Sequence, residues 1–181
     1  MRRPTQDELL AAVGKTLPDV IARGLRVLFV GINPSLYTAA VGHHFARPGN
    51  RFWKALHGGG FTDRILAPCE ERLLLAAGCG ITNLVPHATR SAASLSAADY
   101  RAGGEQLAVK VMHYRPQRIA ILGVAAYRIG FGRPRAVIGL QNERLEDTDL
   151  WVLPNPSGLA AGYQMPDFVR LFRQLRDAGE A

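Results

Sequence analysis

The sequence VLFVGINP, residues 27–34, decides the fold class of this chain. It opens with four apolar residues, which is typical of a strand buried on both faces, and it ends in a glycine and an Asn33-Pro34 turn. Three further short apolar runs follow downstream, at residues 81–85, 119–122 and 151–153. Four such runs predict a small, mainly parallel four-stranded sheet.

Helical signals alternate with these runs. Thr5 and Glu8 have the spacing of a capping box, in which two side chains satisfy backbone N–H groups reciprocally, and Ser96 and Asp99 form a similar start. Pro166 suits the first turn of a last helix. An apolar stripe follows it at Phe168, Leu171, Phe172 and Leu175. Strands that alternate with helices predict an α/β protein with a three-layer α/β/α sandwich.

The length of 181 residues suits one domain, spanning residues 1–181, with a single core and no need of disulfides or a structural metal. The 48% hydrophobic and 20% charged residues are typical of a soluble globular protein. No apolar run approaches the roughly 20 residues of a membrane span, and the first residues lack the apolar segment of a signal peptide. We therefore expect a cytoplasmic, nucleoid-associated protein with no membrane partner.

The net charge of +7 favours an anionic partner, because each phosphate that a protein neutralises releases condensed counterions. The two cysteines, Cys69 and Cys79, lack the paired spacing of a zinc or iron–sulfur site, and we expect both to be buried. The neighbours His43 and His44 make a poor metal site, since adjacent side chains in an extended segment point opposite ways. The sequence therefore predicts no metal and no cofactor.

Two Asn-Pro turns follow predicted strands of the same sheet, Asn33-Pro34 after the first run and Asn155-Pro156 after the last. Ligands of open α/β sheets bind beyond the carboxyl ends of the strands, so both turns belong to the ligand-binding edge. Proline restricts the backbone of the residue before it, and a restricted backbone aims the side chain. A single Asn-Pro pair is most often only a turn. Two of them at one edge indicate a polar binding site.

Four motifs carry a family resemblance: GINP at residues 31–34, GHHF at 42–45, PGNRFWK at 48–54 and NPSGL at 155–159. With these motifs the chain resembles the mismatch-specific uracil-DNA glycosylases and the thymine-DNA glycosylases of the uracil-DNA glycosylase superfamily. The likeness extends from about residue 24 to about residue 175. Long, separated motifs in the expected order are far more specific than a lone glycine-rich loop.

The resemblance implies a hydrolase, namely a monofunctional DNA glycosylase that cuts the bond between deoxyribose and uracil in mismatched DNA, with thymine or other modified bases as further substrates. A base inside a duplex is unreachable, so the nucleotide must be flipped into a pocket. The product is an abasic site for base excision repair. The implied partner is double-stranded DNA with a mispaired or damaged base, and we expect a monomer that needs no cofactor.

Asn33 is the first catalytic residue that the resemblance implies, because such enzymes use its amide to position a water against the sugar C1′. An amide is no base at neutral pH, so it supplies orientation and a dipole that stabilises an oxocarbenium-like sugar. Between Gly31 and Lys54 there is no Asp or Glu to activate water more strongly, and we therefore expect a slow enzyme. His44 is the second catalytic candidate, able to contact the base, the water or a phosphate.

The resemblance also assigns binding residues. Phe45 is expected to stack on the flipped base, and Asn83 follows the thymine-type pattern. Leu159 is expected to enter the minor groove as a wedge, while Gly158 and Ala160 meet the unpaired guanine through backbone groups. The predicted substrate-binding residues are Gly31, Ile32, Phe45, Asn83, Asn155 and Ser157, and the predicted DNA-binding residues are Gly158, Leu159, Ala160, Arg47 and Lys54.

Several residues also have plainer interpretations. Phe45 and Leu159 are residues that an ordinary core would contain. Arg51 is either a phosphate contact or a support of the pocket, and Asn50 is expected to hold its loop by local hydrogen bonds. Four other arginines are interpreted mainly as solvated surface. These are Arg90, Arg128, Arg133 and Arg135.

Departures from the family pattern leave alternatives open. Ser35 replaces the usual glycine after the Asn-Pro pair, and Ala160-Ala161 stand where bacterial relatives often carry Ser-Arg. The missing arginine favours a broader uracil or hypoxanthine glycosylase without strict mismatch dependence. Two other classes are a non-catalytic damage-sensing DNA-binding module, against which the intact Asn33 argues, and a nucleoside-hydrolysing or nucleotide-binding enzyme, which does not account for the wedge loop.

Overall fold

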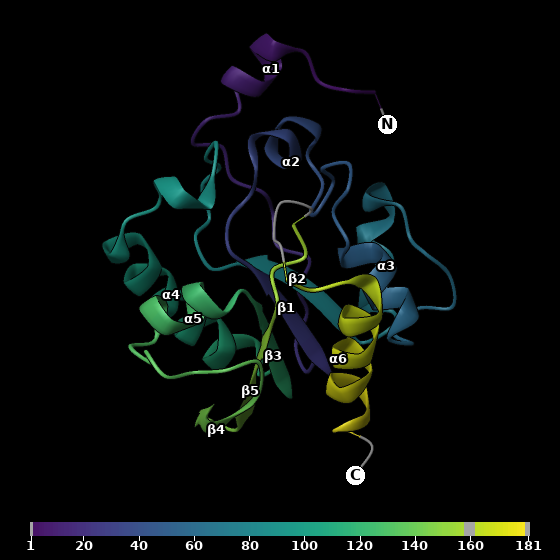
Figure 1. Ribbon diagram of the computed structural model, residues 1–181, viewed down its shortest axis with the longest axis vertical. Coiled ribbons are helices and arrows are strands. Elements are labelled where there is room, and N and C mark those ends of the chain that lie inside the picture. The colour runs from purple at the N-terminus through teal and green to yellow at the C-terminus, as the bar shows by residue number, and fades with distance from the viewer. Residues whose placement is uncertain (1, 158–161, 180–181) are drawn as a thin grey trace.

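A five-stranded sheet forms the centre of the computed structural model, which describes residues 2–157 and 162–179 (Figure 1). The strands lie in the order β2-β1-β3-β5-β4. Their bounds are β1 Val27–Gly31, β2 Cys79–Asn83, β3 Arg118–Leu122, β4 Gly139–Leu145 and β5 Thr148–Leu153. The four apolar runs of the sequence overlap β1, β2, β3 and β5, and these four strands are parallel.

The prediction of a mainly parallel four-stranded sheet is wrong by one strand, because β4 pairs with β5 in the antiparallel direction and makes the sheet mixed. The sequence of β4, GLQNERL, alternates between half-buried and exposed residues. An edge strand with one solvated face needs no continuous apolar run. The apolar runs that mark the four parallel strands are therefore no guide to β4.

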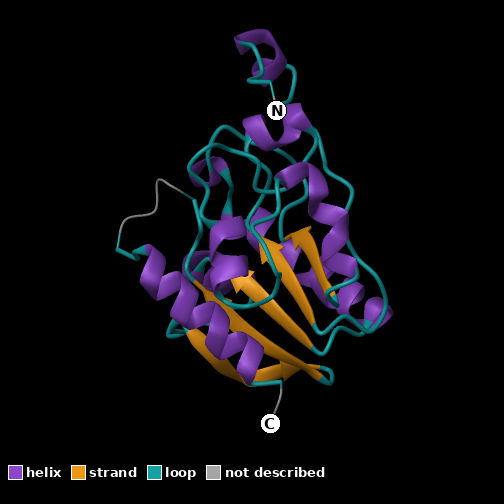
Figure 2. Cartoon of the chain, turned by 90° about the vertical axis from the view of Figure 1, so that its right-hand side faces the viewer, coloured by secondary structure: helices purple, strands orange, loops and turns teal. Residues whose placement is uncertain are grey.

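Helices cover both faces of the sheet, α3 and α6 on one side and α4 and α5 on the other (Figures 1 and 2). The described α-helices are α1 Gln6–Leu10, α2 Leu36–Val41, α3 Phe52–Gly58, α4 Ala97–Tyr114, α5 Val124–Gly130 and α6 Met165–Asp177. Two short 3-10 helices are η1 Pro68–Leu75 and η2 Ala92–Ser94. The arrangement is an α/β fold in which the mixed sheet forms the middle layer.

The side chains of β1 alternate between two cores. Phe29 is fully buried under α3 and α6, where its ring meets Phe52 edge-on at 5.4 Å and stacks on Phe172 at 5.6 Å. Leu28, on the opposite face, packs in the core that contains Leu107 of α4. Burial on both faces explains why β1 is a continuous apolar run.

Both capping boxes that the sequence predicts are present. The Thr5 N–H donates to the Glu8 carboxylate at 2.7 Å, and the Glu8 N–H donates to Thr5 Oγ1 at 3.3 Å. Ser96 and Asp99 begin α4 in the same way. The last helix, α6, has Pro166 in its first turn and buries the apolar stripe that the sequence shows. Local sequence signals thus determine where these helices begin.

The two cysteines have different surroundings. Cys79 is buried in β2, and this burial raises the pKa of its thiol to about 11. Cys69 is exposed near the start of η1, so the prediction that both cysteines are buried is wrong. The turns of η1 bury Leu74 and Glu71 and leave Cys69 on the outer side.

Candidate active site

A cavity of about 330 Å³ lies at the carboxyl ends of the parallel strands. The strand register brings Gly31, the last residue of β1, beside Asn83, the last residue of β2. Leu122 at the end of β3 and Asn155 just after β5 line the same space. The cavity therefore occupies the edge of the sheet at which an open α/β fold binds its ligand.

Most of the residues that the sequence singles out meet in this cavity. Those that line it are Gly31, Ile32, Asn33, His44, Phe45, Arg47, Asn83, Asn155 and Ser157. Lys54 is exposed on α3 and does not line it. Gly158, Leu159 and Ala160 lie outside the described residues. The strand order thus brings the motifs of residues 31–54 and the motif that begins at residue 155 to one site.

The side-chain amide of Asn33 is held in one orientation. Its Nδ2 donates to Thr89 Oγ1 at 2.8 Å and to the His87 carbonyl at 3.2 Å. The Thr89 hydroxyl donates its own proton to the Ser91 carbonyl at 2.8 Å, so Thr89 Oγ1 must act as an acceptor toward Asn33. Both hydrogens of the amide are engaged by the loop after β2, and Oδ1 is the atom available to the cavity.

Asn155 uses its side chain differently. Its Oδ1 accepts the Ser157 N–H at 2.9 Å, which closes a local turn over Pro156. The sequence allows each Asn-Pro pair to be either a simple turn or a polar binding group, and the two pairs differ in this respect. Asn155 acts chiefly as a turn residue, whereas the amide of Asn33 is braced from another part of the chain.

His44 lines the cavity with only 2% of its surface exposed, and it contacts Asn83. Its Nε2 lies 3.0 Å from the Pro18 carbonyl, which can only accept, so Nε2 carries a hydrogen. In the neutral ring Nδ1 is then an acceptor, and it lies 3.5 Å from Asn83 Nδ2. This contact turns the amide nitrogen of Asn83 toward His44. The geometry favours a supporting role for the imidazole over direct contact with a reacting atom.

Gly31 has no room for a side chain. A Cβ atom there would lie 2.6 Å from Asn83 Oδ1 and 3.3 Å from Phe45 Cζ. Contacts near 2.6 Å are far inside van der Waals distance, so any other residue would displace the Asn83 amide. A glycine at the end of β1 keeps the floor of the cavity open to a ligand.

Phe45 forms a wall of the cavity and has an unusual backbone. Its φ is +52°, a left-handed conformation that is rare for an aromatic residue and costs free energy. The ring stacks on the fully buried Phe52 with centroids 4.1 Å apart. Next to it, the His44 N–H donates to the buried carboxylate of Glu71 at 2.7 Å. Packing from Phe52 and this hydrogen bond hold the strained turn in place.

The cavity is electropositive at its rim. Arg47 and Arg90 line it and are both exposed. Among the described residues that line it there is no carboxylate. The imidazole of His44 contacts the Pro18 carbonyl and Asn83 through its two ring nitrogens. The site can orient a water molecule and attract an anionic ligand, which agrees with the chemistry that the sequence predicts for Asn33.

Thr89 and Glu71 are site residues that sequence reasoning missed. Thr89 belongs to the loop after β2, and Glu71 belongs to η1, between β1 and β2. Neither is part of a motif that the sequence shows. Asn50, by contrast, holds its loop as predicted, because its Oδ1 accepts the Phe52 N–H at 2.9 Å. Ser35 has a structural use as well, since its hydroxyl caps α2 by accepting the Thr38 N–H at 3.2 Å.

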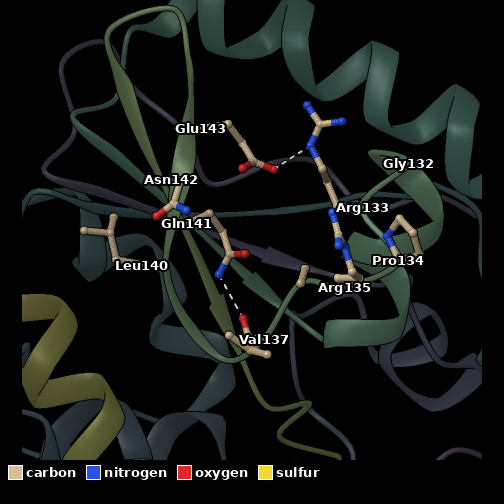
Figure 3. Close-up of a pocket in the computed structure, with 10 residues that line it drawn as sticks. Gly132, Arg133, Pro134, Arg135, Val137, Leu140, Gln141, Asn142 and Glu143 are labelled. Carbon is tan, nitrogen blue, oxygen red and sulfur yellow. Dashed lines mark hydrogen bonds and ion pairs between the residues drawn. The ribbon is translucent and has the colours of Figure 1, made fainter.

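A second cavity, of about 500 Å³, lies beside the edge strand β4 (Figure 3). Two of its charged groups pair with each other, Arg133 with Glu143 at 2.7 Å, and the neighbouring Arg128 donates to the Ala136 carbonyl. The Tyr127 hydroxyl and the Arg133 guanidinium hold the pKa of Glu143 below its usual range. These contacts stabilise the edge of the sheet and offer no reactive group.

Across residues 2–157 and 162–179, no group of three or more His, Cys, Asp or Glu side chains is arranged to hold a metal ion. None of the helices in these ranges has the length and apolar character needed to cross a membrane.

Two comparisons with known proteins bear on the fold and the family of this chain. The solution NMR structure of a candidate uracil DNA glycosylase from Methanosarcina acetivorans is similar to this chain, with a TM-score of 0.57, 16% sequence identity, and coverage of 91% of this chain and 99% of that one. At that identity the similarity shows a shared fold. A family model described as the Uracil DNA glycosylase superfamily matches residues 18–176, which is most of the chain. The chain therefore belongs to the Uracil DNA glycosylase superfamily and is a DNA glycosylase, a hydrolase of glycosidic bonds in DNA.

Proposed function

We propose that this protein belongs to the mismatch-specific branch of its superfamily and excises uracil opposite guanine in double-stranded DNA. The GHHF motif and Asn83 follow the thymine-type pattern, which extends the proposal to thymine opposite guanine. The product is an abasic site for base excision repair. We further propose that the enzyme works as a monomer on nucleoid DNA.

The observation that carries this proposal is the fixed amide of Asn33. With both Nδ2 hydrogens given to Thr89 and His87, Oδ1 is free to accept a hydrogen bond from a water molecule. Such a water keeps its lone pairs directed away from Asn33 and toward a bound nucleotide. A preorganised amide can contribute several kcal/mol by orientation, because the entropy of placing the water is lost before the reaction begins.

The reaction proceeds by loss of the base before full attack of water. The bond between C1′ and the base nitrogen breaks, the bonding electrons leave with the base, and the sugar becomes an oxocarbenium-like cation. The Asn33 Oδ1 dipole stabilises that positive charge. The oriented water adds to C1′ and loses a proton, which passes to the departing base anion and leaves the free base neutral. Because no carboxylate of the described residues lines the cavity, we propose that the chemical step is slow.

Asn83 is the proposed reader of the base. Uracil presents an N–H donor next to a carbonyl acceptor, whereas cytosine presents the reverse pattern at these positions. With its Nδ2 turned toward His44, the amide offers Oδ1 as an acceptor and keeps its second hydrogen as a donor. This orientation matches uracil and opposes cytosine. Phe45 completes the pocket by stacking on the flipped base.

Residues at and near the rim of the cavity are proposed to contact the duplex. Arg47 is proposed to contact a phosphate, and exposed Lys54 to add to the basic surface nearby. Leu159 is proposed to fill the gap that the flipped nucleotide leaves, with Gly158 and Ala160 at the unpaired guanine. A flipped base costs a few kcal/mol in lost stacking and pairing, and an apolar wedge offsets part of that cost.

The test uses end-labelled duplexes that carry uracil or thymine opposite guanine, followed by alkali cleavage of abasic sites. We expect the wild-type protein to excise uracil from the U·G duplex faster than thymine from the T·G duplex, and Asn33→Ala to lower the single-turnover rate about 100-fold or more. Asn142→Ala is the matched control, because Asn142 is an exposed asparagine on β4 and should leave the rate unchanged. Wild-type activity in Asn33→Ala would overturn the role of the oriented water.

A second candidate function is uracil excision without regard to the opposite base. The pair Ala160-Ala161, in place of the Ser-Arg pair of many bacterial relatives, favours it. The same assay with U·A duplexes and uracil in single strands separates the two candidates. Equal rates on all three substrates support the broader enzyme, and a strong preference for U·G supports the mismatch-specific one.

A further inference from the structure

Arg51 joins the two halves of the active site. Its backbone N–H donates to the Pro156 carbonyl at 2.9 Å. Its guanidinium donates to the Ser157 carbonyl at 2.7 Å through Nη2 and to the Tyr163 carbonyl at 2.6 Å through Nη1. The guanidinium also lies over the fully buried ring of Phe168, 4.5 Å from its centroid. One residue of the PGNRFWK motif thus contacts the NPSGL motif at Pro156 and Ser157 and the chain beyond that motif at Tyr163.

The geometry of the guanidinium sets the spacing of those two carbonyls. Its planar fork directs N–H groups along fixed lines, so Ser157 and Tyr163 are held at one separation. Phe168 of α6 supports the fork from beneath through a cation–π contact. A lysine has one rotatable ammonium and cannot reproduce this arrangement. The described residues on either side of 158–161 are therefore tied to a common point.

The turn that contains Arg51 also supports the opposite wall of the cavity. Asn50 Oδ1 accepts the Phe52 N–H, and the Phe52 ring carries Phe45 on its face. Residues 50–52 thus hold the proposed base-stacking wall through Phe52 and the rim at Ser157 through Arg51. This one turn thus contacts both the wall and the rim.

We propose that Arg51 is a positioning residue, which keeps the Asn155–Ser157 rim in register with Phe45 while a duplex is engaged and a base is flipped. The inference rests on the proposed function. Its alternative is the role that the sequence also allows, a direct contact with a DNA phosphate. The two roles differ in chemistry. A phosphate contact needs only positive charge, whereas the positioning role needs the planar guanidinium, which bonds two carbonyls at once.

Two substitutions separate these roles. Arg51→Lys keeps the charge and loses the fork, and Arg51→Met keeps much of the apolar stem and loses both. We expect both variants to lower the single-turnover excision rate at saturating enzyme by roughly tenfold to hundredfold, because small misplacements of a reacting group have effects of that size. We expect the slope of log affinity against log salt to stay at its wild-type value in Arg51→Met as well as in Arg51→Lys, because a positioning residue neutralises no phosphate.

Two other arginines are the controls. Arg47→Met, at the exposed rim, should lower the salt slope by about one, as loss of a phosphate contact does. Arg173→Met removes a guanidinium that also donates to a backbone carbonyl, that of Gly58 at 3.3 Å, but on the outer side of α6, and it should leave rate and slope unchanged. A wild-type excision rate in Arg51→Lys, together with a reduced salt slope in Arg51→Met, would overturn the positioning role of Arg51.

Hydrogen exchange supplies a readout that does not depend on activity. Loss of the fork should speed exchange in peptides that contain Ser157 and Tyr163, and leave the centre of α6 and the sheet protected. Unchanged exchange in Arg51→Lys overturns the inference, and so does a uniform loss of protection, which would make Arg51 a general stability residue. If the wild-type protein excises no base from any substrate, the proposed function fails, and the exchange result alone decides the role of Arg51.

Discussion

The Asn-Pro dipeptide occurs twice at the active site, and its asparagine has a different role in each case. Asn33 gives its amide hydrogens to Thr89 and His87, and Asn155 gives its amide oxygen to the Ser157 N–H. In the first case the surroundings engage the amide hydrogens and leave the oxygen for a ligand, and in the second the oxygen accepts a hydrogen bond within its own turn. The chemistry of an asparagine is thus decided by which of its two polar ends the surroundings engage.

Thr89 should therefore matter to catalysis through Asn33. Thr89→Val keeps the shape of the side chain and removes the acceptor for Nδ2. A hydrogen bond of this kind contributes about 0.5–1.5 kcal/mol, so we expect the single-turnover rate to fall roughly threefold to tenfold. Thr89→Ser keeps the hydroxyl and should stay close to the wild-type rate. Equal rates in Thr89→Val and Thr89→Ser would show that the amide of Asn33 is oriented by other contacts.

At the scale of elements, α4 contains two adjacent glycines that a helix would not select. Gly103 and Gly104 are buried where α4 crosses the chain after β2 and the end of α5. A Cβ on Gly103 would overlap the Leu84 carbonyl oxygen. The two glycines that weaken the helix by propensity thus let α4 lie close to the chain after β2 and to the end of α5.

The substitution Gly103→Ala shows whether helix propensity or packing contributes more to the free energy of unfolding at this position. Helix propensity alone raises the free energy of unfolding by up to about 1 kcal/mol, whereas overpacking against a backbone oxygen lowers it by about 1–3 kcal/mol. We expect packing to dominate and the free energy of unfolding in urea to fall. Ala102→Gly, at the adjacent exposed position of α4, measures the propensity term. A more stable Gly103→Ala protein would contradict the close approach of α4.

At the scale of the whole molecule, charge sets a limit on stability in acid. The chain has 22 Lys and Arg residues against 15 Asp and Glu residues. Several carboxylates have a pKa below the usual range because of fixed partners. The Arg64 side chain and the Ala67 N–H lower the pKa of Glu70 to about 2, and the hydroxyl and N–H of Ser96 lower that of Asp99. Protonation of such groups removes both their local bonds and the balance of charge.

Acid should therefore unfold the protein in a defined window. A carboxylate with a depressed folded-state pKa stabilises the fold above its unfolded pKa of about 4, and this contribution is lost as the pH falls through the folded-state value. We expect the Tm to fall between about pH 5 and about pH 2. Glu143→Gln should lower the Tm at neutral pH, and its difference from wild type should shrink across that window. Glu105→Gln, an exposed carboxylate on α4, is the control, and an equal effect there would contradict the role of Glu143.

Much of the fold and the location of the site could be predicted from local patterns. The strands β1, β2, β3 and β5 are buried on both faces, so their apolar runs are visible in the sequence, and Thr5, Ser96 and Pro166 mark where helices begin. The edge strand β4 carries no such run, because one side of it meets water. Cys69 shows the same limit, since its exposure depends on how η1 lies against the body of the protein.

By itself the sequence determined the α/β class, the capped helices and the pairing of Asn33 with Asn155 at one edge of the sheet, because each follows from periodicity, capping or the rule that parallel strands end together. Only the tertiary structure decided which way Asn33 faces and what Arg51 holds. Thr89 lies 56 residues from Asn33, and Ser157 and Tyr163 lie 106 and 112 residues from Arg51. A hydrogen bond acts over about 3 Å, so its partners are known only when the folded chain has brought them together.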